Sequence, residues 1–96
     1  MEALPDRFDK IEILAETELN RALKMMVDIY PEAANSYHHD IADAINIWIM
    51  EKGDKNIADY IVNKLPLIAE DGNIKVVLRE WANKLSSKSQ MEGSVG

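Results

Sequence analysis

Residues 40–85 read DIADAINIWIMEKGDKNIADYIVNKLPLIAEDGNIKVVLREWANKL, and this stretch contains three similar helix starts. At each start an aspartate or asparagine, a residue type that caps helix N-termini well, directly precedes an isoleucine. The three pairs are Asp40-Ile41, Asn56-Ile57 and Asn73-Ile74. They predict helices over residues 41–52, 57–70 and 74–86, stacked back and forth along the chain.

The last of these helices has the clearest pattern. Its apolar residues recur at i, i+3, i+4, i+7, i+8 and i+11, which places them on one face of a helix. They are Ile74, Val77, Leu78, Trp81, Ala82 and Leu85. In the helix over 57–70, Pro66 disfavours helical geometry at Leu65, so we expect a kink at Pro66.

Residues 45–50, Ile-Asn-Ile-Trp-Ile-Met, are apolar around most of a helical circumference. A helix that is apolar on several faces is normally a buried one. The β-branched Ile45, Ile47 and Ile49 are spaced by two, which is also typical of a strand. The cap at Asp40 and the alanines that follow it favour the helix.

Upstream, the apolar residues from Phe8 to Ala33 follow one another at intervals of three or four, as on one face of a helix. Pro5 and Asp6 are typical of a helix start. Pro31 lacks an amide hydrogen and clashes with the preceding turn, so it should end or sharply kink the helix after Tyr30. We therefore expect one long helix over residues 6–30, and a short helix over 32–37 that begins after Pro31.

Together these patterns predict an all-α protein of four to five helices, with a long N-terminal helix followed by a compact antiparallel array. The 96 residues are 47% hydrophobic and 29% charged, which suffices for one small core. We expect a single domain over residues 1–86. Residues 87–96 contain serine and glycine with little to bury, so they predict a disordered tail.

Composition narrows the class of protein. With no cysteine, the chain forms no disulfide and offers no thiolate nucleophile. No apolar run approaches the roughly 18 residues of a membrane-spanning helix, and the acidic start of the chain is unlike a signal peptide. The net charge of −6 opposes approach to nucleic acid and to anionic lipid. We expect a cytoplasmic protein that does not contact membranes.

Candidate residues for chemistry are few. His38 and His39, the only histidines, could supply a zinc or iron site together with Asp40 or Asp43. However, neighbouring side chains point about 100° apart on a helix, and no HxxxH spacing is present. Most serines lie in or beside the predicted tail, where none could be held for nucleophilic attack. The sequence therefore predicts a protein that is not an enzyme and holds no metal or cofactor.

The C-terminal helix differs in charge from the rest of the chain. Residues 74–88 have a net charge of +3, and Lys75, Arg79 and Lys84 could contact DNA phosphates. The junction before this helix is longer than the turn of three or four residues usual in DNA-binding helix pairs. DNA binding is therefore the alternative function, less favoured than protein binding.

The apolar content exceeds what one small core needs. The first helix carries several large apolar residues outside its main stripe, and in so small a body some of them should stay exposed. Two-fold self-association is a simple way to bury them. We therefore predict a small acidic interaction module, such as a regulator, adaptor, inhibitor or immunity-type binder, that forms a homodimer and binds a protein partner. The predicted interface is Leu14, Leu23, Met25, Val27 and Met50.

Overall fold

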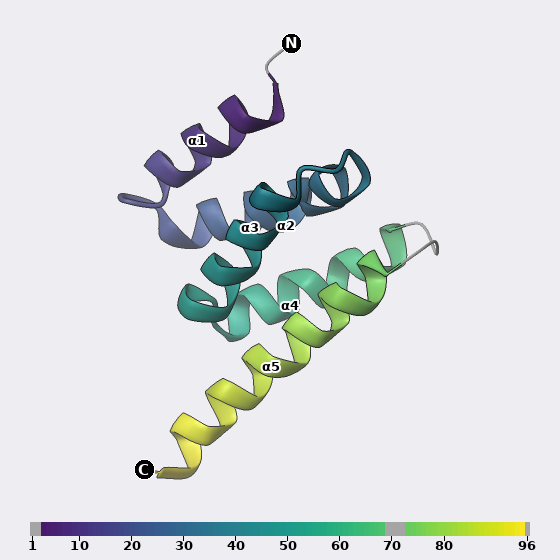
Figure 1. Ribbon diagram of the computed structural model, residues 1–96. Coiled ribbons are helices and arrows are strands. Elements are labelled where there is room, and N and C mark those ends of the chain that lie inside the picture. The colour runs from purple at the N-terminus through teal and green to yellow at the C-terminus, as the bar shows by residue number, and fades with distance from the viewer. Residues whose placement is uncertain (1–2, 69–72, 96) are drawn as a thin grey trace. The chain divides into compact units, whose positions relative to one another are not determined.

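The computed structural model describes residues 3–68 and 73–95, with side chains up to Lys88. Five α-helices and one short 3-10 helix occupy these residues, and no strand is assigned within them (Figure 1). They are α1 (Leu4–Leu14), α2 (Leu19–Asn35), α3 (His39–Lys52), α4 (Lys55–Lys64), η1 (Leu65–Leu67) and α5 (Ile74–Val95). The all-α prediction is confirmed.

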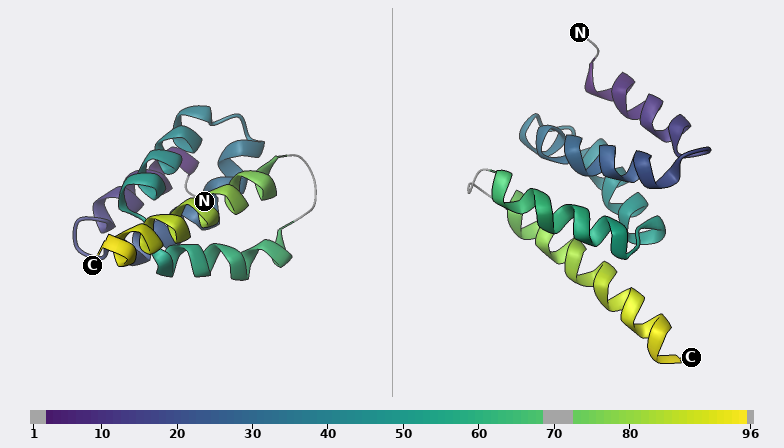
Figure 2. Two further views of the ribbon diagram at one scale, coloured as in Figure 1. Left: turned by 90° about the horizontal axis from the view of Figure 1, so that it is seen from below. Right: turned by 180° about the vertical axis from the view of Figure 1, so that it is seen from behind.

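The chain divides into two units, Met1–Ile49 and Met50–Gly96. In the first unit α1 packs against α2 and runs in the opposite direction (Figure 2). In the second unit α4 packs against α5 in the same way, with η1 at the end of α4. The single domain expected over residues 1–86 stays a prediction.

The predicted long helix over residues 6–30 is wrong, because the chain turns at residues 15–18 and forms α1 and α2 instead. Thr17 is β-branched, and its hydroxyl donates a hydrogen bond to the Leu14 carbonyl at 3.4 Å, which competes with the helical ladder. Glu18 leaves helical geometry, with φ −134° and ψ 70°, and α2 begins at the next residue. The predicted apolar stripe survives this turn, since Phe8 and Met26 are both buried.

Pro31 does not end its helix, so the separate helix predicted over 32–37 is also wrong. Pro31 lies four residues before the end of α2, which continues past it to Asn35 without the hydrogen bond that a proline cannot donate. Ser36 then closes the helix: its backbone amide and its hydroxyl both donate to the Glu32 carbonyl, at 3.0 and 2.6 Å.

The turn from α2 into α3 is a Schellman motif. The His38 amide donates to the Ala33 carbonyl at 3.0 Å, as this motif requires. Tyr37 takes the left-handed position between them, with φ 63°. Glycine is the usual residue there because it lacks a Cβ atom, so Tyr37 holds a strained backbone conformation.

The helix predicted over 41–52 is confirmed as α3, and the strand alternative is excluded. Ile45 and Ile49 are 0% exposed while Ile47 between them is 54% exposed, as helical period requires. The helix begins at His39, earlier than predicted, since the His38 carbonyl already accepts from the Ala42 amide at 3.0 Å. Asp40 therefore lies in the first turn of α3 and is not its cap.

The start of α4 also lies two residues earlier than predicted. Asp54, not Asn56, is its cap, and its Oδ1 accepts from the Ile57 amide at 3.2 Å. The predicted helix is interrupted at Pro66 but not by a kink, since α4 ends at Lys64, η1 covers the proline and Ile68 is extended. The last part of the predicted helix, residues 69–70, falls outside the described residues.

The start of α5 at Ile74 is confirmed, and the Asn73 carbonyl accepts the first helical hydrogen bond from the Val77 amide at 2.9 Å. Most of the predicted stripe is buried, namely Ile74, Leu78, Trp81, Ala82 and Leu85. The end predicted at residue 86 is wrong, because α5 continues to Val95. The expectation that residues 87–96 form a disordered tail stays a prediction.

Candidate protein-binding groove

A groove of about 460 Å³ lies between α1 and α2 in the first unit. Its volume falls within the range of about 300–1,000 Å³ that is usual for binding sites. Four of its six lining side chains are apolar and two are cations. The lining consists of Arg7, Lys10, Ile11, Leu14, Met25 and Ile29.

The antiparallel packing of α1 on α2 gives this groove two different ends. Arg7, near the start of α1, forms an ion pair with Glu32, near the end of α2. In the same register Leu14, at the end of α1, lies opposite Met25 in the first half of α2. Arg7 and Leu14 are about 10 Å apart along α1, at 1.5 Å per residue. One end of the groove therefore carries Arg7 and Lys10, and the other is apolar.

The floor of the groove is apolar and remains partly exposed to solvent. Ile11 is buried, Leu14 and Ile29 are half-buried, and Met25 is 38% exposed. Methionine is adaptable in shape, which suits it to a surface that receives another molecule. This floor can therefore bury apolar groups of a ligand.

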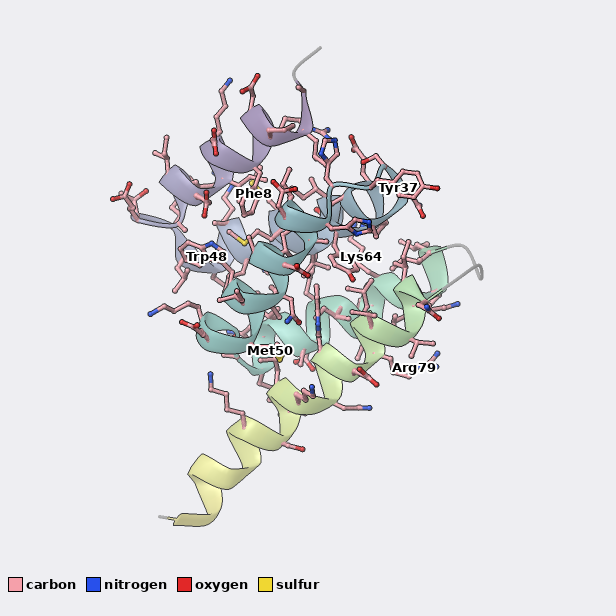
Figure 3. All side chains as sticks on the ribbon, viewed as in Figure 1. Phe8, Tyr37, Trp48, Met50, Lys64 and Arg79 are labelled. Atoms are coloured by element: carbon pink, nitrogen blue, oxygen red, sulfur yellow. The ribbon has the colours of Figure 1, made fainter. Side chains whose placement is uncertain are left out.

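In the first unit α3 also contacts α1, through a side-chain hydrogen bond. Trp48 lies beside the C-terminal part of α1 (Figure 3), and its indole nitrogen donates to Glu12 Oε2 at 3.1 Å. This bond is partly buried, so it holds α1 more firmly than an exposed contact would. The helix that forms one wall of the groove is thus held by both α2 and α3.

The guanidinium of Arg7 is incompletely satisfied. Nη2 faces a carboxylate oxygen of Glu32 in the ion pair, but without the alignment of a hydrogen bond. Nε is buried and has no hydrogen-bond partner. A buried donor without a partner is unfavourable, and charge-assisted bonds to anionic oxygens are among the strongest available to arginine.

The charge of the groove is opposite to that of the surrounding unit. Residues 1–49 contain 4 basic and 10 acidic residues. Two of the basic residues line the groove. Among the side chains that the structure describes, no acidic one lines it. The groove is therefore a local cationic site on an acidic unit.

The structure brings together two of the five predicted interface residues, Leu14 and Met25. Leu23 and Val27 are buried, so the prediction that they face a partner is wrong. The cause is the turn at residues 15–18, since a hairpin buries a wider face of α2 than one long helix would. Met50 is half-buried in the second unit, and its role in an interface stays a prediction.

Sequence reasoning missed Arg7, Lys10, Ile11 and Ile29 as site residues. The first three share one face of α1 with Leu14, because they are spaced by three or four residues. This spacing, which can be read from the sequence, could have indicated a shared face of α1. Ile29 could be added only once the hairpin was known.

The predicted nucleic-acid residues do not form one surface. Lys75 and Arg79 are four residues apart and share an edge of α5, whereas Lys84 lies about 180° around the helix from Lys75, at 3.6 residues per turn. Arg79 points outward from α5 (Figure 3). DNA binding through these three residues stays a prediction, and absence of a gel shift at low salt would refute it.

Other features of the chain give no further indication of chemistry. Across residues 3–68 and 73–88, no group of three or more histidine, aspartate or glutamate side chains is placed to hold a metal ion. Within the same residues no helix combines the length and apolarity needed to cross a membrane. Comparison with protein-family models, with curated proteins and with solved structures finds no match.

Proposed function

We propose that this protein is a small, acidic, non-enzymatic interaction module of the cytoplasm, which binds a protein partner through the groove between α1 and α2. The observation that supports this proposal is the convergence of Leu14 and Met25, from different helices, on one partly open apolar floor. Burying such a floor contributes about 25 cal/mol for each Å² of apolar surface removed from water. A regulator, adaptor, inhibitor or immunity-type binder would use the groove in the same way.

A helix is the partner element that best fits a groove between two helices. In helix-in-groove recognition, apolar residues about one turn apart enter a hydrophobic channel. The groove offers two apolar pairs in succession, Ile11 with Ile29 and Leu14 with Met25. Two turns of a partner helix would contact both pairs.

Self-association is the second part of the proposal. Outside the groove, Ile13 and Ile47 are large apolar residues of the first unit that remain exposed. Two copies related by a two-fold axis would bury such residues on both chains at once. Sedimentation at tens of micromolar tests this part, and a monomer at that concentration would contradict the homodimer.

Affinity capture with groove variants tests the protein-binding proposal. Met25→Glu places a carboxylate on the apolar floor, so we expect it to lose partners that the wild type retains. Leu19→Glu is the matched control, because Leu19 also lies on α2, is 37% exposed and does not line the groove. Equal capture of the same proteins by both variants and the wild type would refute the groove as the binding site.

A further inference from the structure

We propose that the partner presents an acidic amphipathic helix to this groove. Its carboxylate, in the first helical turn, meets Arg7 and Lys10, and its apolar side chains three to four and about seven residues further on meet the apolar floor. This inference rests on the proposed function of the groove as a protein-binding site. It adds the charge, the spacing and the direction of the element that binds.

Charge complementarity supports an acidic partner. Both cations lie at one end of the groove, although the unit around them is acidic. The Arg7 side chain is 35% exposed, so a partner can reach part of it from solvent. A carboxylate from the partner would extend the ion pair of Arg7 and Glu32 into a three-membered network, with Arg7 between two acids. Glu32 is about half exposed, so it can turn toward water to make room.

The spacing follows from the length of the groove. The cationic and apolar ends are about 10 Å apart along α1, which equals about seven residues of a partner helix. Anionic side chains are favoured at helix N-termini by the helix dipole. The partner helix therefore starts near Arg7 and ends near Leu14, parallel to α1 and antiparallel to α2.

A pair of synthetic peptides tests the inference without altering the protein. The probe is an alanine-based peptide of about 15 residues, long enough to be partly helical in water, with glutamate in its first turn and leucines at the stated spacing. The control peptide carries glutamine in place of that glutamate. In fluorescence polarisation at low salt, we expect the acidic peptide to bind about fivefold more tightly than the control.

Protein variants then locate the charge effect. The double variant Arg7→Gln, Lys10→Gln should lose the fivefold preference while still binding both peptides. Arg21→Gln is the control for loss of a cation elsewhere on the first unit, because Arg21 lies on α2 outside the groove and is highly exposed. It should keep the preference. Glu32→Gln should increase it, because removing the competing acid leaves Arg7 to the peptide alone.

The outcomes separate this inference from the proposed function. Equal binding of both peptides, abolished by Met25→Glu, would overturn the acidic partner and leave the groove as a binding site. If neither peptide binds while Met25→Glu still loses a captured partner, the inference is again overturned and the proposed function stands. Dissociation of a homodimer by the peptide would assign the groove to a second copy of this chain. Tighter binding of laurate than of the peptide would assign it to an amphiphilic carboxylate. Either result would overturn the proposal.

Discussion

Replacing Ile45, Ile47 and Ile49 by alanine, one at a time, measures which face of α3 holds the core. The three side chains are chemically identical and spaced by two. Ile45 and Ile49 are 0% exposed, whereas Ile47 is 54% exposed. Each substitution removes the same atoms from the same helix, so differences in stability report burial alone.

The structure sets the expected magnitudes. Removing a fully buried isoleucine to alanine lowers the free energy of unfolding by about 2–5 kcal/mol. At Ile47 roughly half of the side chain is buried, so the loss is about 1 kcal/mol. The better helix propensity of alanine offsets part of it, by up to about 0.5 kcal/mol. We therefore expect Ile47→Ala to cost less than either buried substitution by at least about 1.5 kcal/mol, which for a chain of this size separates the melting temperatures by about 6–12 °C.

Urea unfolding followed by far-UV circular dichroism measures these differences. Trp48 and Trp81 lie in different units, so fluorescence in a Trp81→Phe background follows the first unit alone. If α3 were a strand, the three isoleucines would share one face and cost similar amounts. A loss at Ile47 as large as that at Ile45 would refute the assignment of the buried face.

Substitutions of Tyr30, Asp54 and Tyr37 test three local features. Burial and, secondarily, the negative charge of Asp43 raise the pKa of Tyr30 above 10.0. The folded state therefore keeps the phenol proton to higher pH than the unfolded state, and stability from this group, complete below about pH 10, is lost as pH rises further. Tyr30→Phe should lose stability less steeply than the wild type in urea titrations above about pH 10. Asp54→Ala removes the cap of α4 and should cost about 1 kcal/mol in thermal unfolding, whereas Asn56→Ala should cost almost nothing. Tyr37→Gly should gain up to about 1 kcal/mol by relieving the left-handed backbone, and Tyr37→Ala, which retains a Cβ atom, should show no such gain.

The C-terminal half could be predicted largely from local signals. The apolar period placed the buried face of α5 correctly, and Pro66 marked the end of α4. The capping residue of α4 was harder to predict, because Asp54 and Asn56 are both good cap residues and lie only two positions apart. Which of the two residues caps the helix depends on the direction in which the chain enters it. The sequence does not give that direction directly.

The N-terminal hairpin could not be predicted from apolar period. The turn at residues 15–18 contains neither glycine nor proline, and the apolar stripe continues across it without a change of phase. In one continuous helix Leu14 and Met25 would lie about 16 Å apart along the axis, at 1.5 Å per residue. In the hairpin they face each other across the groove. The candidate site thus depends on a turn for which Thr17 was the main signal.

The hairpin also changes which apolar residues are left exposed and can bind a partner. A single long helix would have left Leu23 and Val27 for a partner, but the structure buries both. Outside the groove, the large apolar residues that remain exposed in the first unit include separate positions on different helices, such as Ile13 on α1 and Ile47 on α3. In the groove, apolar side chains from two helices converge with a pair of cations. The case for a binding site therefore rests on that convergence, and a partner that required only apolar surface would leave the placement of Arg7 and Lys10 unexplained.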